Sequence, residues 1–115
     1  MNRLCVFLVA CALLLAVPLG WSAEPITVKM KSLSYDPREL EIHVGDSVMW
    51  TNEARTTHTA TSDDEGKTFD TGEIEPGKSS KPVKFEKEGE VKYHCKIHGK
   101  TMSGTVVVKP AGGKD

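Results

Sequence analysis

Apolar residues at every second position recur in short runs between residues 26 and 109, and this pattern limits the fold more than any other feature. The runs cover residues 26–30, 40–44, 48–51, 83–85, 91–95 and 105–109. Alternation with a period of two is typical of strands that have one buried and one solvent-facing side. Turn residues such as Gly45-Asp46 and Pro76-Gly77 separate the runs, and no segment shows a long helical period. The pattern predicts an all-β domain, an antiparallel sandwich or barrel.

Three details refine this strand assignment. Pro82 lies just before one run, and because proline cannot donate to a strand ladder we expect an edge strand there. Residues 53–67 form the longest connection and have room for a short helical turn. In the run that ends at Cys95, the alternation places Tyr93 and Cys95 on the apolar face and His94 on the opposite face.

The first 23 residues have the pattern of a secretory signal peptide. Arg3 gives a positive start, residues 4–19 are almost wholly apolar, and small residues near Ala23 offer a cleavage site. We therefore expect a periplasmic or otherwise exported protein, without stable membrane insertion. Two alternatives stay open: a retained anchor, although a membrane span needs about 20 residues, and lipidation at Cys11. Residues 8–11 (LVAC) resemble a lipobox, although the apolar run continues past them.

Removal of residues 1–23 would leave residues 24–115, which are enough for one small domain. We expect residues 110–115 to fray at its end. The whole chain carries 15 Lys and Arg against 16 Asp and Glu, a formal net charge of −1, and it has no basic stripe. This balance gives no electrostatic basis for binding nucleic acid. We expect a monomer.

The distribution of cysteines narrows the chemistry. Cys5 and Cys11 lie in the predicted signal peptide, so Cys95 is the only cysteine of residues 24–115. A disulfide within the domain is therefore excluded. A lone thiol in an oxidising compartment has to be buried, paired with another chain or bound to a metal.

Metal-ligating side chains gather around that cysteine. Cys95 ends a predicted strand, and His98 and Met102 follow it on the connection to the last strand. A second imidazole is available at His58, on the long connection. Two histidines, one cysteine and a distant methionine are the trigonal set with a weak axial sulfur that suits copper in both oxidation states. The pattern predicts one copper ion held by these four side chains.

Other interpretations of these residues are weaker. A Cys-x-x-His spacing also occurs in zinc sites, but no second cysteine completes one here. A nucleophilic pair of Cys95 and His98 lacks an obvious third group to orient the histidine. Met102 as a plain core residue stays open, because methionine fills gaps readily.

Several other residues of the same types are not expected to bind the metal. His43 and His94 lie on the polar phase of their strands, and Met49 does the same. Met30 lies on the apolar phase of the first run, far from the thiol in sequence. Further residues expected in the core and not in the site are Trp50 and Tyr93.

Several segments together resemble the plastocyanin, amicyanin and pseudoazurin group of cupredoxins, which are blue-copper proteins, over nearly all of residues 24–115. They are residues 35–37 with 40–52, which lead to a first histidine at His58, residues 69–77, and the loop with Tyr93, Cys95, His98, Met102 and Gly104. The resemblance implies an eight-stranded Greek-key β-sandwich with one type 1 copper near one end.

The sequence departs from this group in three ways. Three residues separate His98 from Met102, fewer than in plastocyanin and more than in amicyanin. Thr59 and Lys96 stand where many relatives have the Asn and the Ser or Thr that tie the two ligand segments together, which puts that tie in question. Residues 97 and 99 stand where prolines are frequent, which suggests a less rigid loop.

These observations favour a one-electron carrier that is not an enzyme. The rival is a copper trafficking or storage protein without redox turnover. A copper enzyme is disfavoured because Met102 would fill the axial coordination position that a substrate needs to have open. We expect redox partners to dock near His98, with Lys96 and Lys100 forming a charged edge in place of an apolar rim. Such an edge favours a partner with an acidic face, and residues 63–65 offer a second contact.

Overall fold

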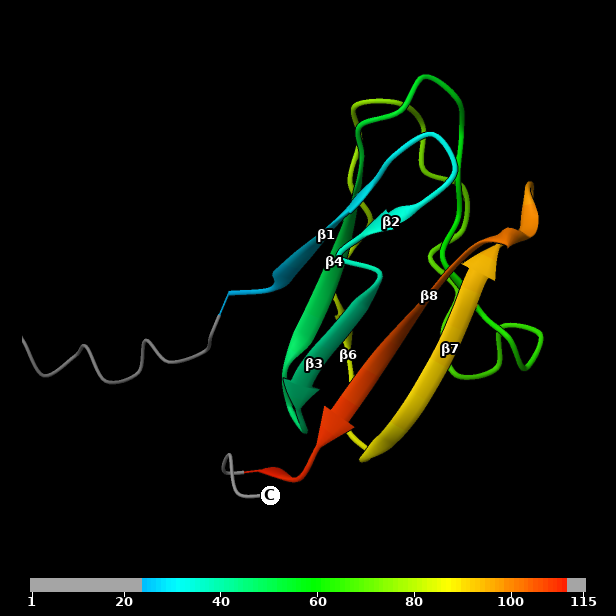
Figure 1. Ribbon diagram of the computed structural model, residues 1–115. Helices are drawn as coiled ribbons and strands as arrows, with labels where there is room; N and C mark the ends of the chain where they lie inside the picture. The colour runs from blue at the N-terminus through cyan, green and yellow to red at the C-terminus, as the bar shows by residue number, and fades with distance from the viewer. Residues whose placement is uncertain (1–23, 112–115) are drawn as a thin grey trace, which may run out of the picture.

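The computed structural model describes residues 24–111. The six predicted runs and two further short strands, at residues 35–36 and 61–62, form two four-stranded sheets (Figure 1). One sheet has the order β2-β1-β4-β6 and the other β3-β8-β7-β5. The strands are β1 (Ile26–Met30), β2 (Tyr35–Asp36), β3 (Glu39–His43), β4 (Ser47–Asn52), β5 (Thr61–Ser62), β6 (Val83–Lys84), β7 (Gly89–Cys95) and β8 (Gly99–Lys109). The expected all-β sandwich of about eight strands is confirmed. The predicted signal peptide and the last four residues lie outside the described residues.

Strand direction differs in part from the expectation of an antiparallel sandwich. β1 runs parallel to β4, and β3 runs parallel to β8. The cause is that the chain leaves the first sheet after β2, forms β3 in the second sheet, and returns to the first sheet at β4. Strands joined by such a crossover can pair in parallel, whereas a tight hairpin cannot make this pairing. The other pairs are antiparallel.

The alternation of apolar residues fills the space between the sheets as predicted. In β4, Val48 and Trp50 are fully buried, and Tyr93 of β7 is buried on the facing sheet. Trp50 stacks on Phe69 with ring centroids 5.0 Å apart, and Tyr93 meets Trp50 edge-on at 5.4 Å. Large aromatic rings dominate the burial of a small core. Trp50 and Tyr93 are therefore core residues, as expected.

The connections agree with the sequence in part. Pro82 precedes β6, which is an edge strand of its sheet. Residues 53–67, expected as one connection, are divided by the short strand β5. The turn that follows β5 is closed by the Gly66 N–H, which donates to the Ser62 carbonyl at 3.0 Å. Within residues 24–111, no helix is long and apolar enough to cross a membrane.

Candidate metal centre

The β7–β8 hairpin carries three of the four predicted ligands. Cys95 is the last residue of β7, and Gly99 begins β8 with a φ of 73°, a conformation that glycine adopts without strain. His94 pairs with Ser103 and Cys95 pairs with Gly99, so residues 100–102 have no partner on β7 and form a bulge. The tight turn brings His98, three residues after Cys95, close to the thiol, and the bulge places Met102 at the same end of the hairpin.

His58 comes from the connection between β4 and β5 and is fixed by its backbone. Its N–H donates to the Ile74 carbonyl at 3.1 Å, and its carbonyl accepts from the Ile74 N–H at 2.7 Å. In Figure 1 this green connection and the orange tip of the hairpin lie toward the same end of the molecule. The backbone of His58 is therefore fixed by its pairing with Ile74 at the end of the molecule that carries the tip of the hairpin.

Asn52, at the end of β4, holds the start of this connection. Its buried side-chain amide donates to the carbonyls of Thr56 and Ile74, both at 2.8 Å, and its Oδ1 accepts from the Ala54 N–H at 2.8 Å. Satisfying a buried amide so completely locks the loop in one shape. Asn52 belongs to the segment before His58 that resembles the cupredoxins, but that resemblance does not by itself predict this role.

The hydrogen bond of the His58 ring decides which nitrogen is free to bind a metal. Nε2 lies 2.8 Å from the carbonyl oxygen of Lys31. A carbonyl only accepts, so Nε2 carries the proton and the lone pair is on Nδ1. Nδ1 faces the Cys95 thiol, 3.8 Å from Sγ. Burial lowers the pKa of His58, which favours the neutral imidazole that a metal requires.

Three of the predicted donors converge. Nδ1 of His98 lies 3.4 Å from Sγ of Cys95, and the donor atoms of His58, Cys95 and His98 all lie within 4.8 Å of one another. His58 and Cys95 are fully buried and His98 is half-buried. A thiol with two imidazoles at this spacing fits copper better than zinc, whose structural sites favour more cysteines.

Met102 is fully buried at the same end of the hairpin. This burial is compatible both with an axial ligand and with a core residue. The side chains that were not expected to bind the metal do lie elsewhere. His94 is on the opposite face of β7 from Cys95, and its Nδ1 is 2.6 Å from Oδ1 of Asp63. Met30 is buried in β1 and Met49 is half-buried in β4.

A tie between the two ligand segments is present despite the unusual residues. The hydroxyl of Thr59 accepts a hydrogen bond from the Lys96 N–H at 2.9 Å, and the Thr59 N–H donates to Sγ of Cys95 at 3.4 Å. Tyr35 adds a bond from its buried hydroxyl to the Thr59 carbonyl at 2.6 Å. This tie could not be predicted from the sequence, because a threonine hydroxyl is shorter than an asparagine amide and reaches its partner only at close approach.

The edge around His98 is mixed and not purely charged. Lys96 and Lys100 are exposed, but each is paired with an acidic residue: Lys96 with Asp70 at 3.1 Å and Lys100 with Asp63 at 3.8 Å. Apolar side chains are also exposed here. Ile97 is 49% exposed, and Leu33, which is 50% exposed, lines one shallow hollow with His98.

A small β-sandwich with one cysteine and two histidines converging at one end, of which Cys95 and His58 are fully buried, is typical of single-domain copper proteins. The family model of the cupredoxin-like domain matches residues 4–108, and the chain belongs to this family. Its buried cysteine and two histidines form a centre of the type 1 copper kind.

Solved structures agree with this assignment. A purple cupredoxin from Nitrosopumilus maritimus is 28% identical with a TM-score of 0.66, covering 73% of this chain and 99% of that one. An oxidised amicyanin variant is 25% identical with a TM-score of 0.65, covering 73% and 81%. A copper-containing nitrite reductase from Thermus scotoductus is 32% identical with a TM-score of 0.66, but the match covers 74% of this chain and only 22% of that one. A comparison with curated protein sequences finds no significant match.

Proposed function

We propose that this protein is an exported one-electron carrier. It uses a single type 1 copper held by His58, Cys95, His98 and Met102. The observation that carries the proposal is the convergence of three donors within 4.8 Å at backbone-fixed positions. Copper, when bound, supplies a Cu(I)/Cu(II) couple. The chain holds the thiol and His58 out of water and keeps their positions through the Ile74 pairing and the Thr59 bonds. Donors that do not move between oxidation states keep the reorganisation small.

The buried ligands favour a carrier over a trafficking protein. Delivery of a metal ion requires ligands that another protein can replace, whereas His58 and Cys95 are both fully buried here. Copper should therefore leave slowly and electrons should exchange fast. The two functions separate in one measurement: copper transfer to an excess of a chelator, compared with the rate of electron self-exchange. Fast transfer with slow self-exchange would support trafficking.

The experiment that tests the site is a titration of the purified protein with Cu(II), followed by visible absorption and a redox titration. We expect one copper per chain, an intense thiolate-to-copper band and a reversible one-electron couple. Cys95→Ser should remove the band while circular dichroism still shows the β-sandwich. An intensely coloured Ser variant would exclude Cys95 as the ligand.

We propose that redox partners dock at the end that carries His98. The exposed side chains of Leu33 and Ile97 offer apolar contact near its ring, and Lys96 and Lys100 stand at the edge with 57% and 70% of their side chains exposed. Because both ammonium groups are paired with aspartates, charge contributes less to association than two free lysines would. Such a surface suits short-lived complexes, in which the two proteins exchange an electron and then separate.

Export of the protein rests on the pattern of residues 1–23, and we propose a periplasmic location after cleavage near Ala23. The measurement is N-terminal sequencing of the protein recovered from the periplasmic fraction of an expressing bacterium. A first residue at position 23 or 24 is expected. Recovery with the leader intact would favour the anchor, and a lipid on Cys11 would favour the lipobox.

A further inference from the structure

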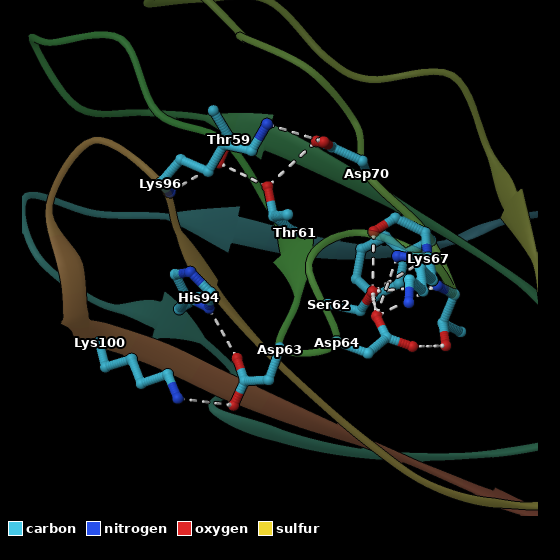
Figure 2. Close-up of polar contacts among 12 residues, drawn as sticks. Thr59, Thr61, Ser62, Asp63, Asp64, Lys67, Asp70, His94, Lys96 and Lys100 are labelled. Carbon is cyan, nitrogen blue, oxygen red and sulfur yellow. Dashed lines mark hydrogen bonds and ion pairs between the residues drawn. The ribbon is translucent and has the colours of Figure 1, made fainter.

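A chain of hydrogen bonds leads from a surface carboxylate to the copper-ligand loop, and Figure 2 shows its members. Oδ1 of Asp70 accepts from the Thr61 hydroxyl at 3.0 Å, and the Thr61 and Thr59 hydroxyls lie 2.9 Å apart. The Thr59 hydroxyl in turn meets the Lys96 N–H at 2.9 Å. Thr59 and Thr61 are both buried. Four residues from three segments thus form one connected path.

The chemistry of the end groups fixes the direction of every bond in this path. An ionised carboxylate only accepts, so the Thr61 hydroxyl donates to Asp70. The Thr61 oxygen then has a lone pair for the Thr59 hydroxyl proton. With its proton directed to Thr61, Thr59 presents a lone pair to the Lys96 N–H. Reversing one bond would place two donors or two acceptors face to face.

The carboxylate at the start of the path is itself firmly held. Oδ1 also accepts from the Gly72 N–H at 3.0 Å, and Oδ2 pairs with the Lys96 ammonium at 3.1 Å. Partial burial acts to raise the pKa of Asp70, but the hydrogen bonds that its carboxylate accepts outweigh this and lower the pKa. The backbones of Thr61 and Asp70 also form an isolated β-bridge. Asp70 is therefore ionised and stationary at neutral pH.

The far end of the path lies on both ligand segments. Thr59 directly follows His58, and its N–H donates to Sγ of Cys95 at 3.4 Å. Lys96 directly follows Cys95. A threonine hydroxyl on its own rotates among three staggered positions and holds a partner weakly. Here Thr61 and Asp70 select one of these positions, which explains how threonine forms the tie that asparagine makes in many relatives.

We propose that Asp70 is a positioning residue for the copper centre, acting through Thr61 and Thr59 on the Lys96 N–H and on the Cys95 thiolate. This inference rests on the proposed function for its redox consequence, but the hydrogen-bond path itself belongs to the metal-free chain. The amide-to-sulfur bond that the path steadies withdraws charge from the thiolate, and such bonds raise the potential of a thiolate-bound metal.

The first test uses the copper-free protein and measures hydrogen exchange of the Lys96 amide by NMR. Thr61→Val keeps the shape of the side chain but removes the hydroxyl, and Asp70→Ala removes the end of the path. Both variants should accelerate exchange at Lys96, while amides in the β3·β8 pairing keep their rates. Thr61→Ser should restore protection. Unchanged exchange at Lys96 in the Thr61→Val variant would overturn the proposal.

Two control variants separate the path from the ion pair and from general charge. Lys96→Gln removes the ammonium but keeps the backbone N–H, so protection of that amide should persist. Glu73→Gln removes a carboxylate from the exposed segment after Asp70 without touching the path. Loss of protection in either control would show that surface charge, and not the hydroxyl path, holds the loop.

The second test measures the reduction potential of the copper-loaded Thr61→Val variant, which has no change in net charge. The potential should fall, because the thiolate loses part of its hydrogen bonding. If hydrogen exchange at the Lys96 amide becomes faster but the reduction potential stays the same, the path only stabilises the loop, and its proposed role at the metal is overturned. Failure of the wild-type protein to bind copper would contradict the proposed function and leave the metal-free exchange test intact.

Discussion

At the scale of single residues, one substitution can isolate the contribution of Met102, a predicted ligand, to the reduction potential. Met102→Leu changes little volume, so the fold should lose less than about 1.5 kcal/mol. The variant should keep copper and show a higher potential, since the oxidised ion loses a donor. A rise on the order of 60 mV corresponds to a tenfold change in the one-electron equilibrium. A redox titration followed by absorption measures it.

The matched controls are Met30→Leu and Met49→Leu. Met30 is as fully buried as Met102 but lies in β1, and Met49 lies in β4. Neither variant should shift the potential. If Met102→Leu behaves like these two, Met102 is a core residue and the site has three ligands.

Gly104 is required by a close approach between β8 and β7. A Cβ atom at this position would lie 2.6 Å from the ring of Tyr93, which is itself held in the aromatic core. Gly104→Ala should therefore destabilise the fold by about 1–3 kcal/mol, as overpacking does. Urea unfolding of the copper-free protein measures the loss. The double variant Gly104→Ala with Tyr93→Leu should show a coupling energy, and simple additivity of the two losses would contradict the steric explanation.

Single residues also show what a sequence can and cannot predict about the site. Cys95, His98 and His58 were predicted because their donor atoms are rare and their spacing matches a metal preference. The roles of Thr59, Thr61 and Asp70 were not predicted. Hydroxyls and carboxylates are common on surfaces, and their bonding depends on a tertiary approach that no local pattern encodes.

At the scale of elements, the turn after β5 depends on the carboxylate of Asp64. It accepts from the hydroxyls of Ser62 and Thr68 and from the Lys67 and Thr68 N–H groups. These hydrogen bonds, with those of the Ser62 and Thr68 side chains foremost, lower the pKa of Asp64 to about 2 from its ordinary 3.8. A lowered pKa means that the ionised group stabilises the fold above pH 3.8, and that this stabilisation is lost as the pH falls toward 2.

The corresponding variant is Asp64→Ala, compared with wild type by urea unfolding of the copper-free protein across this pH range. The variant should be less stable at pH 7, and the difference should shrink steadily below about pH 4. Glu65→Gln removes a carboxylate from the same turn and should show no such convergence. A difference between Asp64→Ala and wild type that stays constant with pH would mean that packing, and not ionisation, accounts for the loss.

The hairpin and the long connection differ in how far the sequence predicts them. The alternation correctly places Cys95 inside and His94 outside, because the side-chain period of a strand is fixed. The bulge of residues 100–102 interrupts the ladder between β7 and β8. It could not be predicted, because no residue pattern indicates where the register of this pairing shifts. The position of His58 depends on its pairing with Ile74, which lies in another connection.

At the scale of the whole molecule, period-two alternation predicts which residues are buried but not which strands pair. Two sheets filled by Val48, Trp50 and Tyr93 would look the same in sequence whether β1 paired with β3 or with β4. The parallel β1·β4 and β3·β8 pairs follow from the path of the chain between the sheets. The Greek-key expectation came from the family resemblance, and the direction of the pairs became known only from the structure.

The arrangement of charge over the molecule gives the last prediction, on where electrons leave. Lys96→Gln with Lys100→Gln removes two positive charges beside His98 and leaves Asp70 and Asp63 without these partners. Oxidation of the reduced protein by hexacyanoferrate(III), an anionic probe, should slow by roughly tenfold or less at low ionic strength. Since charges are screened over about 8 to 10 Å at moderate salt, the difference should fade as salt is added.

The control for this double variant makes the same charge change at the other end of β7. Lys84 and Lys87 line a hollow beside Gly89, where β7 begins, whereas His98 follows its end. Lys84→Gln with Lys87→Gln should therefore slow the reaction much less at equal net charge. Both variants should keep the same stability in urea, so that the rates report on position alone. Equal rates in the two double variants would mean that only net charge matters, and electron exit at the His98 end would then lose its electrostatic support.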